Sequence, residues 1–207
     1  MSEVMTCMPF EQLMNWVLEE KKTKGTVFGQ HRAYAAETDR KLNIFERNLE
    51  TPIGPAAGPH TQLTQNIVAS YYAGARFFEL KTVQKMDGAE LAACVPRPCI
   101  LADDEGYNQE WSTELTVQQA QDEYIKAWCA LKIMSKVYGF GDPDGFVFNM
   151  SVGYDLDGIK GRKVNTYINN MMDAGKTAQF KECKKVLTEL FPEEKDFIAS
   201  ISPNVSR

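Results

Sequence analysis

The chain has 207 residues, of which 43% are hydrophobic and 25% are charged, and its net charge is -5. This is the composition of an ordinary soluble domain. No basic stripe indicates a nucleic-acid groove, and no apolar run reaches the ~18 residues that a membrane span needs. The N-terminus, MSEVMTCMPFEQ, is too polar for a signal peptide. We therefore expect a cytoplasmic protein that binds neither nucleic acid nor membrane.

The five cysteines are odd in number and scattered along the chain, which favours a reducing compartment over a disulfide framework. Cys94 and Cys99 flank Val-Pro-Arg-Pro, and no histidine lies near them. Zinc sites in proteins need paired cysteines or histidines at short spacing. We interpret both residues as loop thiols and predict no metal site.

The N-terminal part predicts a helix and a hairpin. From Pro9 to Lys24 the apolar residues recur at helical spacing, and Gly25 is placed to end the helix. Leu42 to Asn48 alternates apolar and polar residues, as a half-buried strand does. With a turn at Asn48–Glu50, this stretch forms a short hairpin that could close the bottom of a barrel.

The stretch from Thr51 to Gln62 carries the most distinctive pattern. We expect a buried strand over Pro52–Ala57 that ends in Ala56-Ala57-Gly58, where almost no side-chain bulk remains. Such bareness suits a backbone that a flat ligand approaches closely. The functional interpretation is a cofactor at the carboxyl end of a first parallel strand. The alternative is a plain strand-to-helix turn that needs glycine for its dihedral angles.

A strand–helix–strand unit follows. The helix is expected over Leu63–Ala73, and the strand runs from Ala75 to Val83. Lys81 stands at the end of that strand, where a lone buried ammonium is costly, so it must pair with an acid or meet a ligand. An ion pair with Glu79 or Asp103 is the alternative to a ligand contact.

Met86 to Gln109 is long, polar and rich in proline, and we predict a functional loop there. The loop ends in Tyr107-Asn-Gln-Glu-Trp111, where Asn108 and Glu110 offer hydrogen-bonding groups two residues apart that could read the edge of a planar heterocycle. Ordinary turn chemistry and a solvated carboxylate explain the same residues without a ligand. A long amphipathic helix is predicted next, over Val117–Tyr138.

A third unit repeats the pattern. The strand Phe146–Val152 is nearly continuously apolar, and Asn149 and Ser151 place polar groups at its carboxyl end. Helices are predicted over Asp157–Ala174 and Phe180–Phe191.

These units predict an α/β fold: a partial (β/α)8 TIM barrel made of the first three βα units, with an N-terminal helix and hairpin, in a single domain over 1–207. A closed barrel needs about 250 residues, and its usual phosphate site comes from the loops after strands seven and eight. The polar stretch Ser200–Arg207 carries no further element. We therefore expect the N-terminal part of a longer chain. Apolar residues around Ile53, Phe78 and Phe148 should face the open inside and favour self-association.

Three phrases carry a resemblance to a known family. PIGPAAG at 52–58, ELKT at 79–82 and the strand at 146–152 resemble the first three strands of the FMN-binding barrel of dihydroorotate and dihydropyrimidine dehydrogenases. The chain is more similar to the N-terminal region of the YgfK-type selenate reductase subunits. That family shares PxGPAAGPHTQL, ELKTVQ, EWSTE and FNMSVGYxLxGIK with this chain, and the similarity spans nearly all of it.

The resemblance implies a role for each matching residue. The residues that it places against FMN are Ala56, Ala57, Gly58, Lys81 and Thr82. The residues that it places near the substrate are Asn108, Glu110, Asn149 and Ser151. Lys81 would stabilise negative charge on the reduced flavin ring.

As a function, the resemblance implies part of a flavin-dependent oxidoreductase that acts on a small N-heterocycle or a related oxidant. FAD, NAD(P)H and iron–sulfur clusters would belong only to the full-length protein, with its other domains or subunits. The dehydrogenases carry their acid/base residue on a cysteine-containing loop after the fourth strand, which this chain does not reach, so no catalytic residue is assigned and the isolated chain is expected to be inactive. The alternative is a non-catalytic scaffold or subunit contact.

Overall fold

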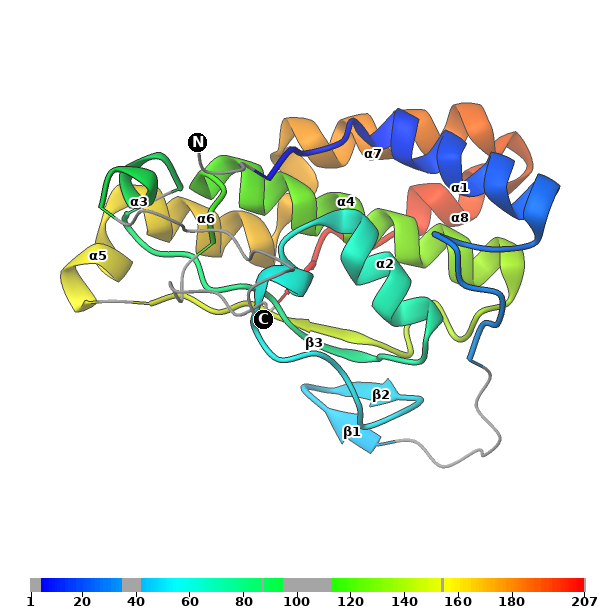
Figure 1. Ribbon diagram of the computed structural model, residues 1–207, viewed down its shortest axis with the longest axis horizontal. Coiled ribbons are helices and arrows are strands. Elements are labelled where there is room, and N and C mark those ends of the chain that lie inside the picture. Colours follow the sequence, from blue (N-terminus) through cyan, green and yellow to red (C-terminus); the bar gives the residue numbers. More distant parts are fainter. Residues whose placement is uncertain (1–4, 35–41, 87, 95–112, 154, 207) are drawn as a thin grey trace.

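A computed structural model describes residues 5–34, 42–86, 88–94, 113–153 and 155–206. Its helices are α1 Phe10–Lys24, α2 Thr64–Tyr72, α3 Gly88–Cys94, α4 Val117–Tyr138, α5 Leu156–Lys160, α6 Arg162–Met172, α7 Ala178–Leu190 and α8 Lys195–Ser200. Its strands are β1 Leu42–Ile44, β2 Arg47–Leu49, β3 Phe77–Glu79 and β4 Val147–Asn149. Short 3-10 turns occupy Pro59–Thr61, Ala174–Lys176 and Pro192–Glu194. The helices lie on one side of the β3–β4 pair and the β1–β2 hairpin on the other (Figure 1).

Helix α4 is the centre of the packing, because it lies between the β3–β4 pair and the outer helices α1 and α7 (Figure 1). Trp128, in its middle, packs against Phe146 and Phe148 with ring centroids 5.1 and 5.6 Å apart. The Thr116 side chain caps the first turn, and Gly139 ends the helix with a φ of 65°. The predicted bounds of this helix are confirmed.

The predicted parallel pairing is confirmed, but it is shorter than the apolar runs suggest. Phe77, Phe78 and Glu79 pair with Val147, Phe148 and Asn149, and a further parallel bridge joins Val83 to Val152. Four steps separate Glu79 from Val83 along the chain, whereas three separate Asn149 from Val152. The β3 side therefore carries one extra residue, a bulge that interrupts the ladder just past both strands.

The segment Pro52–Ala57 was predicted to be a strand, but it forms no regular strand. This segment is extended and runs beside β3, where the Ile53 carbonyl accepts hydrogen bonds from Arg76 N at 2.8 Å and Phe77 N at 3.3 Å. A regular ladder does not form, because the prolines at positions 52 and 55 have no N–H to donate. A Cβ on Gly54 would lie 1.4 Å from the Phe77 carbonyl oxygen, so glycine is needed there for close approach to β3.

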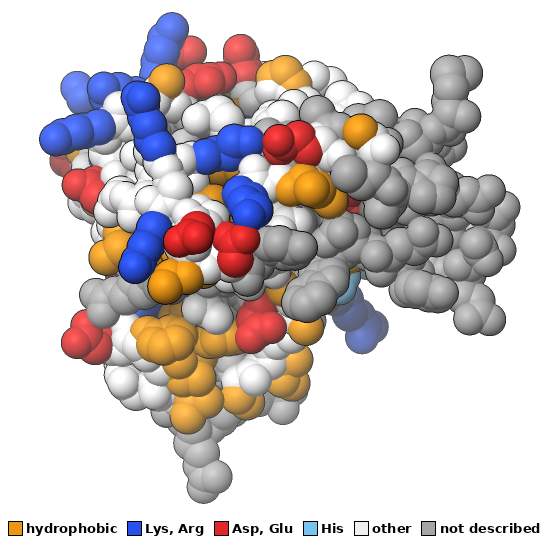
Figure 2. All heavy atoms as spheres, turned by 90° about the vertical axis from the view of Figure 1, so that its left-hand side faces the viewer, with side chains coloured by type: hydrophobic (Ala, Val, Ile, Leu, Met, Phe, Trp, Pro, Cys, Tyr) orange, Lys and Arg blue, Asp and Glu red, His pale blue; other side chains and the backbone are white. Residues whose placement is uncertain are grey.

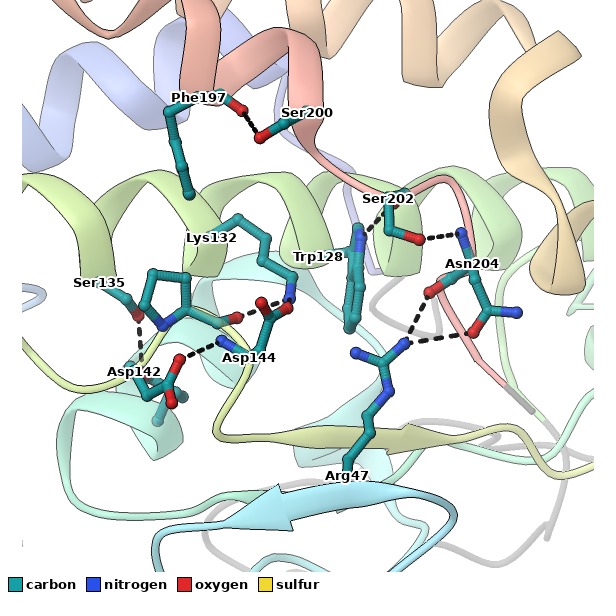
Figure 3. Close-up of polar contacts among 12 residues, drawn as sticks. Arg47, Trp128, Lys132, Ser135, Asp142, Asp144, Phe197, Ser200, Ser202 and Asn204 are labelled. Atoms are coloured by element: carbon teal, nitrogen blue, oxygen red, sulfur yellow. Dashed lines mark hydrogen bonds and ion pairs between the residues drawn. The ribbon is translucent and has the colours of Figure 1, made fainter.

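The predicted hairpin is confirmed, but its turn lies at Phe45–Glu46, where both residues have positive φ, and not at Asn48–Glu50. Arg47 fixes the hairpin to the rest of the fold. Its guanidinium lies 5.0 Å from the Trp128 ring centroid and donates to the Asn204 side-chain oxygen at 3.2 Å (Figure 3).

The C-terminal stretch Ser200–Arg207 is not the loose polar end that its composition suggests. Val205 N donates to the Met171 carbonyl at 3.0 Å. The buried Ser206 hydroxyl donates to the Phe148 carbonyl at 2.8 Å and accepts from Met150 N at 2.6 Å. The stretch therefore supplies the hydrogen bonds that β4 lacks on its outer side, a tertiary role that local composition does not reveal.

Three further predictions need correction. The helix expected over Asp157–Ala174 is two helices, because Gly161 is extended with a ψ of 148° between α5 and α6. Helix α3 occupies part of the stretch from Met86 to Gln109 that was expected to be a loop. Residues 95–109 of that stretch lie outside the described part of the chain. Phe78 and Phe148 are buried and face the helices, whereas Ile53 is 69% exposed. The N-terminal helix and the helix predicted over Phe180–Phe191 are confirmed as α1 and α7.

Candidate functional site

The carboxyl ends of β3 and β4 bring several of the predicted site residues together. Leu80 N donates to the Asn149 carbonyl at 3.0 Å, and Val83 N donates to the Ser151 carbonyl at 2.9 Å. Parallel strands place their carboxyl ends at one edge of a sheet, where α/β proteins bind ligands. Within the described chain, the candidate site is this edge, which we call the strand-end site.

Thr82 and Ser151 form the centre of the strand-end site. Their hydroxyl oxygens lie 2.9 Å apart, and either hydroxyl can be the donor. The bulge lies between Glu79 and Val83, so it sets where the Thr82 side chain points relative to β4. A hydroxyl pair of this kind can donate to and accept from a polar ligand.

Lys81 is 3% exposed and lies within the bulged segment. Its backbone carbonyl accepts the hydroxyl of Tyr124 at 2.8 Å, and burial raises the pKa of Tyr124 well above its usual range, so that hydroxyl remains a donor. Glu79 forms no ion pair with any residue in the described ranges, which removes one of the two partners considered for Lys81. The other, Asp103, lies outside the described residues.

The Ala56–Gly58 turn reaches the same edge through Thr61. Thr61 N donates to the Gly58 carbonyl at 2.9 Å, and the Thr61 carbonyl accepts from Lys81 N at 3.4 Å. Ala56 is exposed and Ala57 is half-buried, so small side chains face open space here. Gly58 is different, because a Cβ at this position would lie 2.6 Å from the His60 ring.

A buried polar cluster behind the turn was not predicted. The Gln62 side-chain oxygen accepts from the Thr113 hydroxyl at 2.5 Å and from Glu114 N at 2.9 Å, and its amide nitrogen donates to the Glu114 carboxylate. All three residues are buried. The cluster fixes the turn after Gly58 to the segment that leads into α4. Polar residues in two loops carry no periodic signal, so the sequence offered no basis for pairing them.

Glu123 is a second missed residue. Its carboxylate accepts the backbone N–H and the hydroxyl of Thr64, both at 2.7 Å, at the first residue of α2, and it forms an ion pair with Lys126. The positive end of α2 is therefore already neutralised by a side chain of α4. The signal that could have shown this is a carboxylate inside the apolar stripe of α4, three residues after Ala120.

Of the other predicted site residues, Asn149 is half-buried at the end of β4, while Asn108 and Glu110 lie outside the described residues. The described residues contain no group of three or more His, Cys, Asp or Glu side chains placed to hold a metal ion. Among the described helices, none is both long and apolar enough to cross a membrane.

Comparison with known proteins identifies one family. Residues 28–207 match the family described as oxidoreductase YgfK, N-terminal TIM-barrel domain. The chain is 43% identical over 197 residues to the protein named "Putative oxidoreductase YgfK" in Escherichia coli K12, and equally to its counterpart in Escherichia coli O157:H7. In both cases the match covers 94% of this chain but 19% of the relative, so the chain spans about a fifth of their length. No solved structure matches.

Proposed function

We propose that this chain, which belongs to the family of the N-terminal TIM-barrel domain of oxidoreductase YgfK, supplies part of an FMN site in a flavin-dependent oxidoreductase. The activity concerns the whole protein, of which the chain matches about a fifth. The observation that carries the proposal is the buried Lys81 in the bulge beside the Thr82–Ser151 hydroxyl pair.

The polar groups of Lys81, Thr82 and Ser151 suit the polar edge of a flavin. A flavin ring carries carbonyl oxygens and an N–H group, and hydroxyls such as those of Thr82 and Ser151 can serve either kind of partner. When bound, FMN would supply the electron-transfer chemistry. Lys81 would hold a positive charge at this edge, which favours an anionic reduced ring. The side chain of the half-buried Ala57 is small, so it would let a flat ligand come close to the edge.

The phosphate of FMN needs another location. Helix N-termini commonly bind phosphate, but the Glu123 carboxylate already occupies the first N–H group of α2. A second anion there would meet like charge. The phosphate would therefore be held by later parts of the barrel, in agreement with the usual phosphate loops after strands seven and eight.

The substrate class is the second part of the proposal. Asn149 and Ser151 lie two apart at the end of β4 and, by strand alternation, on the side opposite Phe148, which faces the helices. We assign Asn149 with Asn108 and Glu110 to a small N-heterocycle or a related oxidant. FAD, NAD(P)H and iron–sulfur clusters would belong to other parts of the full-length protein.

A scaffold without catalysis is the second candidate, and one observation favours it. The bareness of Gly54 serves a contact within the chain, because a Cβ there would lie 1.4 Å from the Phe77 carbonyl oxygen. A Cβ on Gly58 would meet only the exposed ring of His60, which can move aside. The flavin proposal therefore rests on the strand-end residues more than on the glycines.

The full-length protein tests the proposal. We expect a flavin absorption band, and we expect Lys81→Ala to reduce flavin content or to lower the flavin reduction potential, because a cation next to the ring is lost. Lys160→Ala, at an exposed lysine on α5, is the matched control and should change neither. A colourless protein would favour the scaffold, and unchanged flavin content and potential in Lys81→Ala would remove the role assigned to this lysine.

A further inference from the structure

The bulge beside β4 contains Lys81 and Thr82. These residues lie between Leu80 and Val83, whose N–H groups donate to carbonyls in and just after β4 at 3.0 and 2.9 Å. A bulge interrupts the ladder, and buried peptide groups that lose ladder partners need other partners. The position of the bulged segment is therefore set by the groups that take the place of the ladder.

Groups from α4 and from the segment that leads into it hold the bulge. The Lys81 carbonyl accepts the hydroxyl of Tyr124 at 2.8 Å, and the Thr82 carbonyl accepts Thr113 N at 2.7 Å. Lys81 N donates to the Thr61 carbonyl at 3.4 Å, which is longer than the usual range of a backbone hydrogen bond. Of these two bonds to the backbone of Lys81, the one from Tyr124 is therefore the shorter and the stronger.

Tyr124 is well suited to fix a neighbouring backbone. It is fully buried on the 22-residue helix α4, and its ring centroid lies 6.5 Å from that of Tyr167 on α6. Burial, and secondarily nearby groups that include the carboxylates of Glu123 and Glu114, raise the pKa of Tyr124 well above its usual range. The hydroxyl therefore keeps its proton, and a side chain on a rigid helix presents a permanent donor to the bulge.

We propose that Tyr124 is a positioning residue for the Lys81 ammonium at the strand-end site, an inference that rests on the proposed flavin function. The carbonyl and the side chain of Lys81 are attached to the same Cα, so fixing the carbonyl restricts the direction in which the side chain leaves the bulge. Lys81 is 3% exposed, so a rotation of its peptide would move the ammonium within packed surroundings. The stabilisation of a reduced flavin ring by this cation depends on the distance between them, and it would therefore depend on Tyr124.

The flavin reduction potential of the full-length protein tests this inference. Tyr124→Phe removes the hydroxyl and keeps the ring, so the packing of α4 is preserved. We expect the potential to fall in the same direction as in Lys81→Ala but by less, because the ammonium is still present and only less well placed. FMN binding, measured by titration of flavin-free protein, should weaken by roughly two- to tenfold, as for the loss of one hydrogen bond. A general loss of stability would not move the potential of the flavin that remains bound.

Tyr167→Phe is the matched control. Tyr167 is buried next to Tyr124, but its hydroxyl has no hydrogen-bond partner among the described residues. Its removal should therefore leave the flavin potential and FMN binding unchanged. The double variant Lys81→Ala with Tyr124→Phe completes a thermodynamic cycle. Its potential should equal that of Lys81→Ala alone, because a residue that acts through the ammonium has no effect once the ammonium is absent.

Several results would overturn this inference and leave the flavin function in place. One is a wild-type potential in Tyr124→Phe when Lys81→Ala lowers it, and another is an equal shift in Tyr124→Phe and Tyr167→Phe. Additive shifts in the double variant would show that Tyr124 acts on the flavin without Lys81. An unchanged potential in Lys81→Ala would remove the role of the lysine and this inference with it. A full-length protein without flavin would overturn both the proposed function and this inference.

Discussion

The guanidinium of Arg47 lies over the ring of Trp128, 5.0 Å from its centroid, and joins three segments that are distant in the sequence. Arg47 belongs to the hairpin, Trp128 to the middle of α4, and Asn204, which accepts from Arg47, to the C-terminal stretch (Figure 3). The Lys132 ammonium lies 4.2 Å from the centroid of the same ring, so two cations make cation–π contacts with the Trp128 indole. The hairpin is thereby fixed to the helical layer.

Arg47→Met should lower the free energy of unfolding by about 1–3 kcal/mol, because it removes a cation–π contact and hydrogen bonds to Asn204 while keeping similar bulk. Thermal or urea unfolding measures the loss. Arg32→Met, at an exposed arginine, is the control and should change stability by less than about 0.5 kcal/mol. Equal effects of the two substitutions would show that Arg47 does not fix the hairpin.

Gly54 and Ala57 should respond in opposite ways to added bulk. Gly54→Ala should cost more than about 3 kcal/mol of stability, because its Cβ would overlap the Phe77 carbonyl oxygen and neither backbone can move without losing its pairing. Ala57→Leu should cost little stability, since Ala57 is only half-buried, but should abolish flavin binding in the full-length protein. Unfolding curves and flavin content of both variants provide the comparison. Retention of flavin by Ala57→Leu would place the cofactor elsewhere.

The sequence predicted the elements with long periodic patterns and missed those that depend on distant partners. The 22-residue helix α4 was predicted to the residue. Its apolar stripe and the residues that flank it, Thr116 and Gly139, indicate the same bounds. The β-bulge was not predicted, since it depends on the register between β3 and β4. Neither was the role of Ser206, a polar residue that hydrogen-bonds to the backbone of Phe148 and Met150 in the segment of β4.

The same limit applies to the candidate site. Lys81 and Ser151 were singled out because polar residues at the ends of apolar strands are unusual, and the structure brings their backbone segments to one edge. Glu123 and Gln62 were missed because their importance comes from burial next to partners more than 50 residues away. Burial of that kind follows from tertiary packing and has no local signature.

Cys7 should be a slow nucleophile although it is only half-buried. Burial, and secondarily the carboxylate of Glu123, raise the pKa of its thiol to about 12. The thiolate is the reactive form, so alkylation of Cys7 at pH 8 should be at least about tenfold slower than that of a cysteine in an unstructured peptide. Peptide mapping after timed iodoacetamide treatment separates Cys7 from the other cysteines. Its rate should rise to the peptide value in guanidinium chloride, and a fast reaction in the folded chain would contradict the assigned environment.

The last prediction concerns association of the chain on its own. Leu42 and Phe45 of the hairpin are 45% and 48% exposed, and Ile53, whose carbonyl pairs with β3, is 69% exposed. Hydrophobic side chains gather on the lower part of the molecule, where the hairpin lies (Figure 2). In a closed barrel the remaining strands would cover the side of the sheet that faces away from the helices. The 207-residue chain should therefore self-associate, most simply as a two-fold dimer, with this apolar surface at the contact.

Light scattering and an absorption spectrum of the purified chain test this prediction. We expect a dimer without tightly bound FMN, because the loops that would hold the phosphate come from later strands. Ile53→Glu combined with Phe45→Glu should give a monomer, because both charges would be buried at the contact. Glu substitutions at the exposed Leu156 and Met172, on the helical side, form the matched control and should leave the dimer intact. A monomer that holds stoichiometric FMN would mean that this chain closes its own barrel face and carries a complete flavin site.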